Sequence, residues 1–265
     1  MPAGRLKYVR RNRKLPRTPR SGLNKTEKKQ TNAIAKAVVN RNQEVKQRAW
    51  QINSAYSLKH NVQAILFGST TNGGLLNLKQ QGATASTHLT SRPHPVTSIP
   101  LNNAGFLREG NKIRCSSVHL NLCLTTPNDR QGTKLRCIMF WYPVGHDTQW
   151  SDLVGDSGIT GAYNTLLIPT NRNSQCKIFM DKIYTIGPAG AGAAAGGNYQ
   201  TTTMLKLRKS FKGGKVITYN SASNSDSPER WNIGFACVAF NNNDALVSDT
   251  FMNFEYSGNM YFRDA

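Results

Sequence analysis

The feature that most constrains the fold of this chain is a two-residue alternation of apolar and polar side chains. In residues 113–124 (IRCSSVHLNLCL), Leu120 and Leu122 alternate with His119 and Asn121. Successive side chains of a strand point to opposite faces, so this period predicts a half-buried strand rather than a helix. Similar stretches predict strands at 62–67, 134–142, 176–186, 203–211, 215–220, 231–240 and 250–262. About eight strands separated by Asn-, Gly-, Asp- and Pro-rich turns predict an all-β antiparallel sandwich or barrel.

Between these strands the sequence predicts one short helix and one long irregular segment. Residues 148–154 form the helix, with Asp147 as its cap and Trp150 and Leu153 facing inward. Residues 68–111 are polar and rich in Gly, Thr, Ser and Pro. We expect them to form excursions on one side of the sandwich.

Positive charge is concentrated at the N-terminus. The chain of 265 residues has 34 Lys and Arg against 14 Asp and Glu, and residues 1–50 hold 15 of these bases with only Glu27 and Glu44 as acids. Because residues 1–23 are strongly basic and poor in apolar side chains, we expect a disordered arm that requires a polyanion. The bases that we expect to contact nucleic acid are Arg5, Lys7, Arg10, Arg11, Arg13, Lys14, Arg17, Arg20, Lys25, Lys28 and Lys29.

A basic amphipathic helix is predicted over residues 24–50. Asn24 and Glu27 have the spacing of a capping box, and apolar side chains recur at helical period beyond them. The stretch is rich in Ala and has no Trp, Phe or Leu before Trp50, which argues against a helix lying in a membrane surface. No stretch reaches the roughly 18 apolar residues of a membrane span, and no apolar core follows the basic N-terminus. We therefore expect neither membrane insertion nor a secretory signal.

A second basic surface is predicted in the body of the chain. Between Asp181 and Asp226 the sequence contains no acid, and Leu205 and Leu207 alternate with basic residues. With Gly213-Gly214 as a turn, this segment reads as a hairpin that packs one side and presents charge on the other. Either an ordinary solvated surface or a weaker nucleic-acid contact fits this pattern. Its bases are Lys206, Arg208, Lys209, Lys212 and Lys215.

The sequence predicts no metal and no cofactor. The five cysteines are odd in number and lie in apolar or alternating stretches, which indicates buried thiols in a reducing compartment. Cys115, His119 and Cys123 are of metal-ligand type and would share one strand face. In a straight strand, however, the two cysteines would lie about 26 Å apart, too far for one zinc ion.

Two motifs resemble enzyme signatures without the residues that the chemistry needs. Gly155-Asp156-Ser157-Gly158 matches the nucleophile sequence of trypsin-like proteases, but no partner segment with the general-base His precedes it. Gly190–Ala195 fits a relaxed dinucleotide fingerprint, but Gly196 and Gly197 follow it instead of a helix, and the next acid is Asp226. We therefore expect a protein that is not an enzyme.

A family resemblance comes from the order of several stretches. Arg108-Glu-Gly-Asn-Lys-Ile113 and Arg136-Cys-Ile-Met-Phe-Trp-Tyr142 resemble strand starts in the coat proteins of small icosahedral viruses of the satellite-necrosis-virus type. Phe211-Lys-Gly-Gly-Lys-Val-Ile-Thr-Tyr-Asn220 and the terminal Tyr261-Phe-Arg-Asp-Ala265 resemble capsid proteins of circular Rep-encoding single-stranded DNA (CRESS-DNA) viruses. The basic arm, the helix and the strands follow in the same order as in these coats.

The resemblance implies an eight-stranded antiparallel jelly roll over 51–265 that self-assembles into an icosahedral (T=1) shell of sixty copies. It also implies that the arm lies on a packaged single-stranded genome, with DNA favoured by the terminal motifs, and that the protein occurs in the virion and the host nucleus. An import receptor reading Arg10–Lys14 (RRNRK) is a further expected partner. Two alternatives stay open: a coat protein of a small or satellite RNA virus, and a nucleic-acid-binding β-sandwich that does not assemble.

Overall fold

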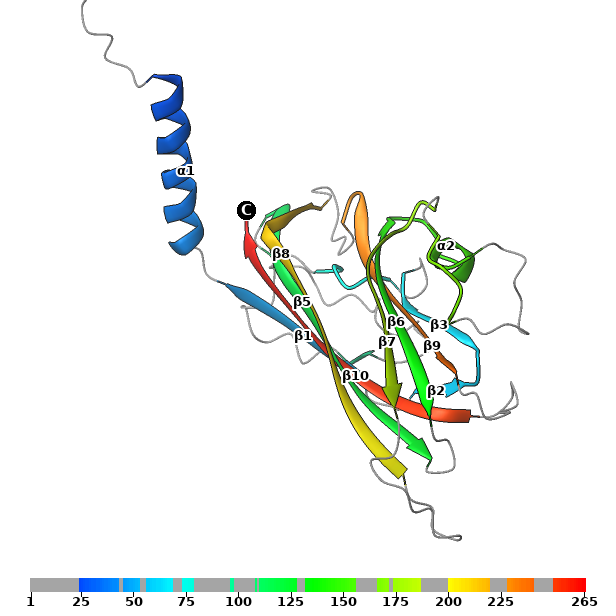
Figure 1. Cartoon of the computed structure of the whole chain (residues 1–265). Helices are drawn as coiled ribbons and strands as arrows, with labels where there is room; N and C mark the ends of the chain where they lie inside the picture. Colours follow the sequence, from blue (N-terminus) through cyan, green and yellow to red (C-terminus); the bar gives the residue numbers. More distant parts are fainter. Residues whose placement is uncertain are drawn as a thin grey trace, which may run out of the picture. The chain divides into compact units, whose positions relative to one another are not determined.

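The computed structural model contains ten strands and two helices among the residues it describes, and the strands form two sheets (Figure 1). The described residues are 24–42, 45–52, 56–68, 73–78, 96–97, 108, 110–127, 132–155, 166–171, 174–186, 200–219, 228–240 and 250–265. None of the helices among them is long and apolar enough to cross a membrane. The chain divides into two compact units, Met1–Gln43 and Glu44–Ala265.

Helix α1 (Lys25–Asn42) forms the described part of the first unit. The side chain of Asn24 accepts a hydrogen bond from the backbone N–H of Glu27 at 2.9 Å, and the Glu27 carboxylate accepts one from the backbone N–H of Asn24 at 2.7 Å. This reciprocal pair is the predicted capping box, which is therefore confirmed. On the same helix, Ile34 and Val38 are exposed apolar side chains.

The helix is shorter than the predicted range 24–50. It ends at Asn42, and Lys46–Ile52 is strand β1, which pairs antiparallel with β10 (Thr250–Asp264). Lys46 is buried and forms an ion pair with Asp264 at 2.6 Å. Pairing with the distant β10 supplies backbone hydrogen bonds that outweigh the helical period of this stretch.

The larger sheet has six strands, in the order β4-β1-β10-β5-β8, with β2 pairing on β10. Its remaining strands are β2 (Tyr56–Lys59), β4 (Val96–Thr97), β5 (Lys112–Pro127) and β8 (Gln200–Thr218). The smaller sheet has four strands, in the order β3-β9-β6-β7. These are β3 (Gln63–Phe67), β6 (Thr133–Pro143), β7 (Lys177–Ile186) and β9 (Trp231–Phe240). Every pairing between strands in both sheets is antiparallel.

One hydrophobic core lies between the two sheets, which makes the second unit an all-β sandwich as predicted. Leu120 and Leu122 of β5 are buried in the same cluster as Phe235 of β9. A second buried cluster includes Phe140 and Leu153, and it is tightly packed at Gly234, where a Cβ atom would lie 2.3 Å from the Phe140 ring. The predicted strands at 62–67, 113–124, 134–142, 176–186, 231–240 and 250–262 correspond to β3, β5, β6, β7, β9 and β10.

The predicted hairpin over residues 206–215 is wrong. β8 continues as one strand through Gly213 and Gly214, which have φ angles of 74° and 75°, and its register with β5 shifts between Cys115 and Ser117. Glycine adopts positive φ without a steric penalty. The two glycines therefore form a bulge, in which β8 has more residues than the facing part of β5, and the chain does not reverse direction.

A separate irregularity, in β5 itself, corrects the prediction that Cys115, His119 and Cys123 share one strand face. Phe262 of β10 pairs with Cys115 and Tyr261 pairs with Ser117, so one residue of β5 is left over between them. Cys115 is fully buried in the core, whereas His119 and Cys123 are half-buried. An irregularity of register moves the following residues to the opposite face. Burial raises the pKa of the Cys115 thiol to about 12.

The short helix α2 (Trp150–Leu153) lies within the predicted range, with Leu153 buried. Its predicted cap is wrong. The Asp152 carboxylate accepts a hydrogen bond from the backbone N–H of Gln149 at 2.9 Å, whereas the Asp147 carboxylate accepts one from the Gln149 side chain at 3.4 Å. Asp152, inside the first turn, therefore accepts the hydrogen bond from the backbone N–H at the start of the helix, and Asp147 does not.

Candidate nucleic-acid interface

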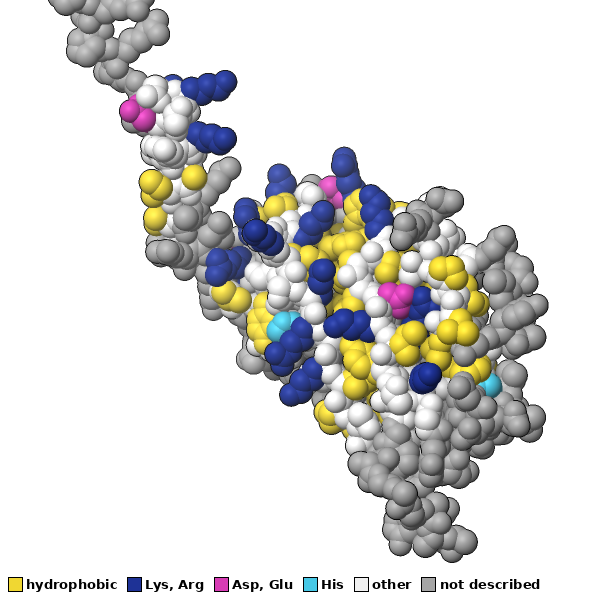
Figure 2. Space-filling view, in the orientation of Figure 1, with side chains coloured by type: hydrophobic (Ala, Val, Ile, Leu, Met, Phe, Trp, Pro, Cys, Tyr) yellow, Lys and Arg dark blue, Asp and Glu magenta, His cyan; other side chains and the backbone are white. Residues whose placement is uncertain are grey.

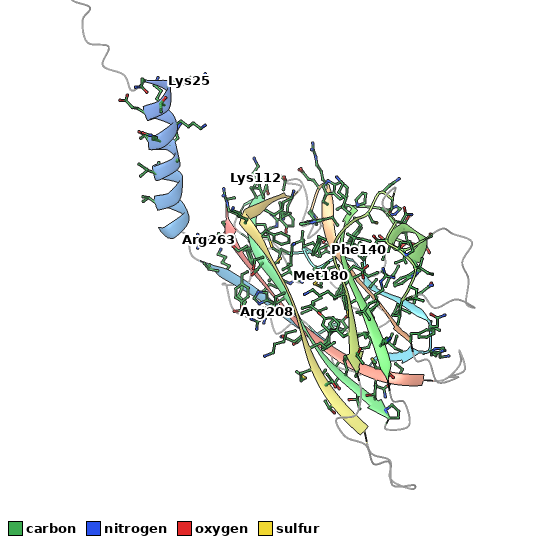
Figure 3. All side chains as sticks on the ribbon, viewed as in Figure 1. Lys25, Lys112, Phe140, Met180, Arg208 and Arg263 are labelled. Carbon is green, nitrogen blue, oxygen red and sulfur yellow. The ribbon has the colours of Figure 1, made fainter. Side chains whose placement is uncertain are left out.

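One side of the six-stranded sheet is polar and basic. It consists of the side chains of β5, β8 and β10 that alternate with core residues, and we call it the outer sheet face. In Figure 3 the labelled Arg208 and Phe140 lie on opposite sides of β8. The basic residues of this face are Lys112, Arg114, Lys206, Arg208, Lys212 and Arg263. On these three strands Glu255 is the acid that shares the face.

The strand register places these bases side by side. Arg114 of β5 is directly opposite Arg263 of β10, and Arg208 of β8 is directly opposite His119 of β5. Figure 2 shows Lys and Arg side chains gathered over this part of the surface. Like charges on neighbouring strands repel each other. The protein therefore keeps a positive field here that a bound polyanion would relieve.

His119 and Tyr261 form an aromatic pair within the outer sheet face, with ring centroids 5.2 Å apart. Partial burial and the neighbouring Arg208 both lower the pKa of His119. The lowered pKa favours the neutral imidazole, so lysine and arginine supply the charge of this face. A neutral ring beside cations offers a surface on which a nucleobase can stack.

The remaining two predicted bases of β8 lie against aromatic rings. Lys209 Nζ is 5.7 Å from the ring centroid of Phe179, and Lys215 Nζ is 5.7 Å from that of Trp141. Phe211 contacts both of these rings, with centroid distances of 6.1 and 5.6 Å. We call these five residues the aromatic–lysine cluster. It joins β8 of the larger sheet to β6 and β7 of the smaller one.

The structure therefore divides the predicted second basic surface into two groups. Lys206, Arg208 and Lys212 are exposed on the outer sheet face, and Lys209 and Lys215 belong to the aromatic–lysine cluster. The predicted alternation is confirmed at Leu207, which is buried between exposed neighbours. The signal that sequence reasoning missed was the aromatic side chains of β6 and β7, which are distant in sequence.

The other predicted nucleic-acid contacts belong to the N-terminal unit. Lys25, Lys28 and Lys29 are exposed on the first turns of α1. The predicted contacts outside the described residues are Arg5, Lys7, Arg10, Arg11, Arg13, Lys14, Arg17 and Arg20. Ser157 and Gly190–Ala195 of the two rejected enzyme motifs also lie outside them.

Comparison with known proteins gives little further information. No protein-family model and no curated protein matches the chain. Among solved structures, the chain is similar to infectious bursal disease virus (Gx strain), with 11% identity over 83% of this chain and 42% of that one and a TM-score of 0.16. The VP2 subviral particle of the same virus has 11% identity over 84% of this chain and 41% of that one, with a TM-score of 0.15. The chain spans less than half the length of either, and superpositions this loose carry no functional argument.

Proposed function

We propose that this chain is a viral coat protein that assembles with copies of itself into an icosahedral shell and packages a single-stranded genome. The observation that carries the proposal is the outer sheet face, where six bases and one acid lie on three adjacent strands. Phosphate contacts dominate nucleic-acid affinity and require such clustered positive charge. The role is structural rather than enzymatic.

The order of the strands supports a jelly roll as the shell-forming domain. If β2 and β4 are set aside, the remaining eight strands, numbered along the chain, form one sheet in the order 1-8-3-6 and one in the order 2-7-4-5. Two packed antiparallel sheets of four strands with this interleaved order correspond to a double Greek key. Because a fold does not determine function, assembly has to be tested directly.

Charge arithmetic supports the packaging role. Sixty chains of net charge +20 would supply about 1,200 positive charges, against one negative charge per nucleotide. We therefore expect a genome on the order of one to two thousand nucleotides. DNA is proposed over RNA on the terminal resemblance alone, since phosphate contacts do not distinguish the sugar. Nuclear import through Arg10–Lys14 is part of the same proposal.

Size-exclusion chromatography and negative-stain microscopy of the purified full-length protein test this function. We expect a discrete megadalton particle with nucleic acid that resists external nuclease. After the shell is opened, digestion by DNase or by RNase identifies the genome. A protein that binds nucleic acid but remains monomeric over a wide range of salt and protein concentration would favour the non-assembling module.

A further inference from the structure

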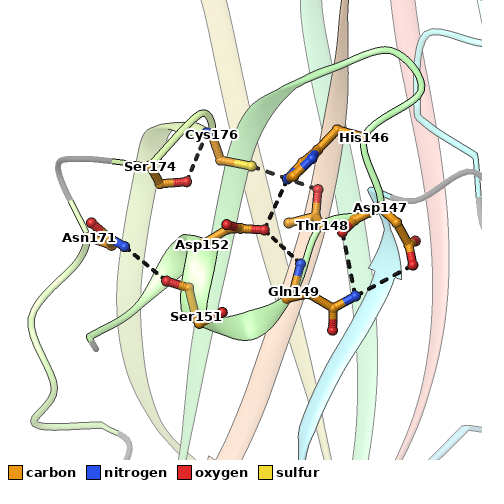
Figure 4. Close-up of polar contacts among 9 residues, drawn as sticks. All are labelled: His146, Asp147, Thr148, Gln149, Ser151, Asp152, Asn171, Ser174 and Cys176. Carbon is orange, nitrogen blue, oxygen red and sulfur yellow. Dashed lines mark hydrogen bonds and ion pairs between the residues drawn. The ribbon is translucent and has the colours of Figure 1, made fainter. Parts of the chain in front are cut away.

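Three potential metal ligands that are distant in sequence meet beside α2. His146 lies in the loop that follows β6, Asp152 lies on α2, and Cys176 immediately precedes β7 (Figure 4). Their ligand atoms all lie within 4.8 Å of one another. His146 Nε2 is 3.0 Å from Asp152 Oδ2. The Cys176 side chain is buried, whereas the His146 and Asp152 side chains are each 25% exposed.

Neighbouring groups hold these three residues in place. The Asp152 carboxylate accepts a hydrogen bond from the backbone N–H of Gln149, as described above for the start of α2. The backbone N–H of Cys176 donates to the Ser174 hydroxyl at 2.9 Å, and Cys176 Sγ lies 3.7 Å from the hydroxyl of the buried Thr148. Such surrounding contacts orient the ligands of protein metal sites.

A second contact ties together the two segments that carry the ligands. The Asn171 side-chain amide donates to the backbone carbonyl of Ser151 at 2.9 Å, so α2 is fixed to the segment that leads into β7. A groove lined in part by Asn171, Ser174 and Cys176 opens beside the cluster. The groove reaches Cys176, and the partly exposed His146 and Asp152 can be approached directly from solvent.

The donor set selects the class of metal. One imidazole nitrogen, one carboxylate oxygen and one thiol sulfur suit Zn²⁺, whereas Mg²⁺ and Ca²⁺ prefer oxygen ligands alone. Zinc–ligand distances of about 2.0–2.3 Å place tetrahedral ligands roughly 3.3–3.8 Å apart. Ligand atoms that lie up to 4.8 Å apart would therefore close by at most about 1.5 Å, a movement that the partly exposed His146 and Asp152 can accommodate.

We propose that His146, Asp152 and Cys176 form a Zn²⁺ site with three protein ligands and one position for water. The ion would link the β6–α2 connection to the start of β7. This site departs from the sequence-based expectation of no metal, and it does not depend on the proposed packaging function. A thiol nucleophile is the other chemistry that a Cys-His-Asp group can supply. That chemistry requires the imidazole to face the thiol, whereas His146 Nε2 faces Asp152 Oδ2 at 3.0 Å and Cys176 Sγ faces the Thr148 hydroxyl at 3.7 Å.

Cobalt substitution and zinc analysis of the full-length protein test the site. Co²⁺ bound by Cys176 gives a thiolate-to-metal charge-transfer band, and we expect about one Zn²⁺ per chain after dialysis. His146→Ala and Cys176→Ser should each weaken Zn²⁺ binding by 10-fold or more. Cys123→Ser is the matched control, because this half-buried thiol lies on the outer sheet face away from the three ligands, and it should leave binding unchanged.

Wild-type protein that binds Co²⁺ without a thiolate band, or that retains no Zn²⁺ above the level of Cys176→Ser, would overturn the proposal. So would equal zinc binding by wild type and both ligand variants. If a variant fails to fold, the cobalt spectrum of the wild type still decides whether a thiolate is a ligand. A zinc site in a chain that does not assemble would contradict the proposed function alone.

Discussion

Strand β8 carries two groups of basic residues that differ only in the side of the strand from which they project. Lys206 and Arg208 alternate with Leu207 and lie on the outer sheet face. Lys209 and Lys215 lie over the rings of Phe179 and Trp141. The first pair is exposed and available to phosphates, whereas the second pair is held by cation–π contacts. Residues of the same charge in one strand can therefore serve different purposes: one pair is placed to bind nucleic acid, and the other pair stabilises the fold.

Removal of residues 1–29 should have the largest effect, and it leaves both groups of β8 in place. The deletion removes 11 Lys and Arg and one Glu, while all ten strands remain. We expect a folded body whose sequence-independent nucleic-acid binding is largely lost, so that only the weaker contribution of the outer sheet face remains. Affinity measured against salt concentration checks this, since each neutralised phosphate contributes a log–log slope of about −0.7 on single strands. An unchanged slope would assign the binding to the body.

Truncation of Phe211 tests whether the aromatic–lysine cluster stabilises the fold. Phe211 contacts the rings of both Trp141 and Phe179. Phe211→Ala therefore removes the centre of the aromatic–lysine cluster, and we expect a loss of about 2–4 kcal/mol in the free energy of unfolding. Met204→Ala is the matched control, because Met204 is 59% exposed. Its effect should stay within about 0.5 kcal/mol. Urea titration followed by tryptophan fluorescence measures both.

Neutralising the two pairs separately tests the comparison itself. Lys206→Gln with Arg208→Gln should reduce the salt slope of single-strand binding by about 1.4, with stability unchanged. Lys209→Gln with Lys215→Gln should lower the free energy of unfolding by about 1–2 kcal/mol, because two cation–π contacts are lost. Equal effects of the two double variants on stability and on binding would remove the distinction between the groups.

The smallest effect is expected from the titration of His119. Partial burial and Arg208 lower its pKa in the folded protein, so the unfolded chain binds a proton first as the pH falls. The contribution of His119 to the free energy of unfolding is fully present above the pKa of the unfolded chain, about 6.5. It is lost as the pH falls through the lower pKa of the folded protein. His119→Asn should lack this component. Urea midpoints of both proteins at several pH values on either side of 6.5 measure the difference.

The sequence by itself determined the elements whose signals are local. The period of two predicted most of the long strands, because alternate side chains of a half-buried strand must differ in polarity. The capping box at Asn24 and Glu27 was equally readable, since both partners lie within one helical turn. Charge composition identified the basic residues of β8 as a surface, and the structure places three of them on the outer sheet face.

Tertiary structure decided what depends on distant partners. Residues 46–50 have a helical period, but pairing with β10 makes them strand β1. The left-handed Gly213 and Gly214 extend β8 as a bulge, because β5 continues to pair on both sides of them. His146, Asp152 and Cys176 meet only because α2 and the start of β7 lie side by side. Contacts between residues far apart in the chain leave no periodic signal in it, so only the folded sheets bring them together.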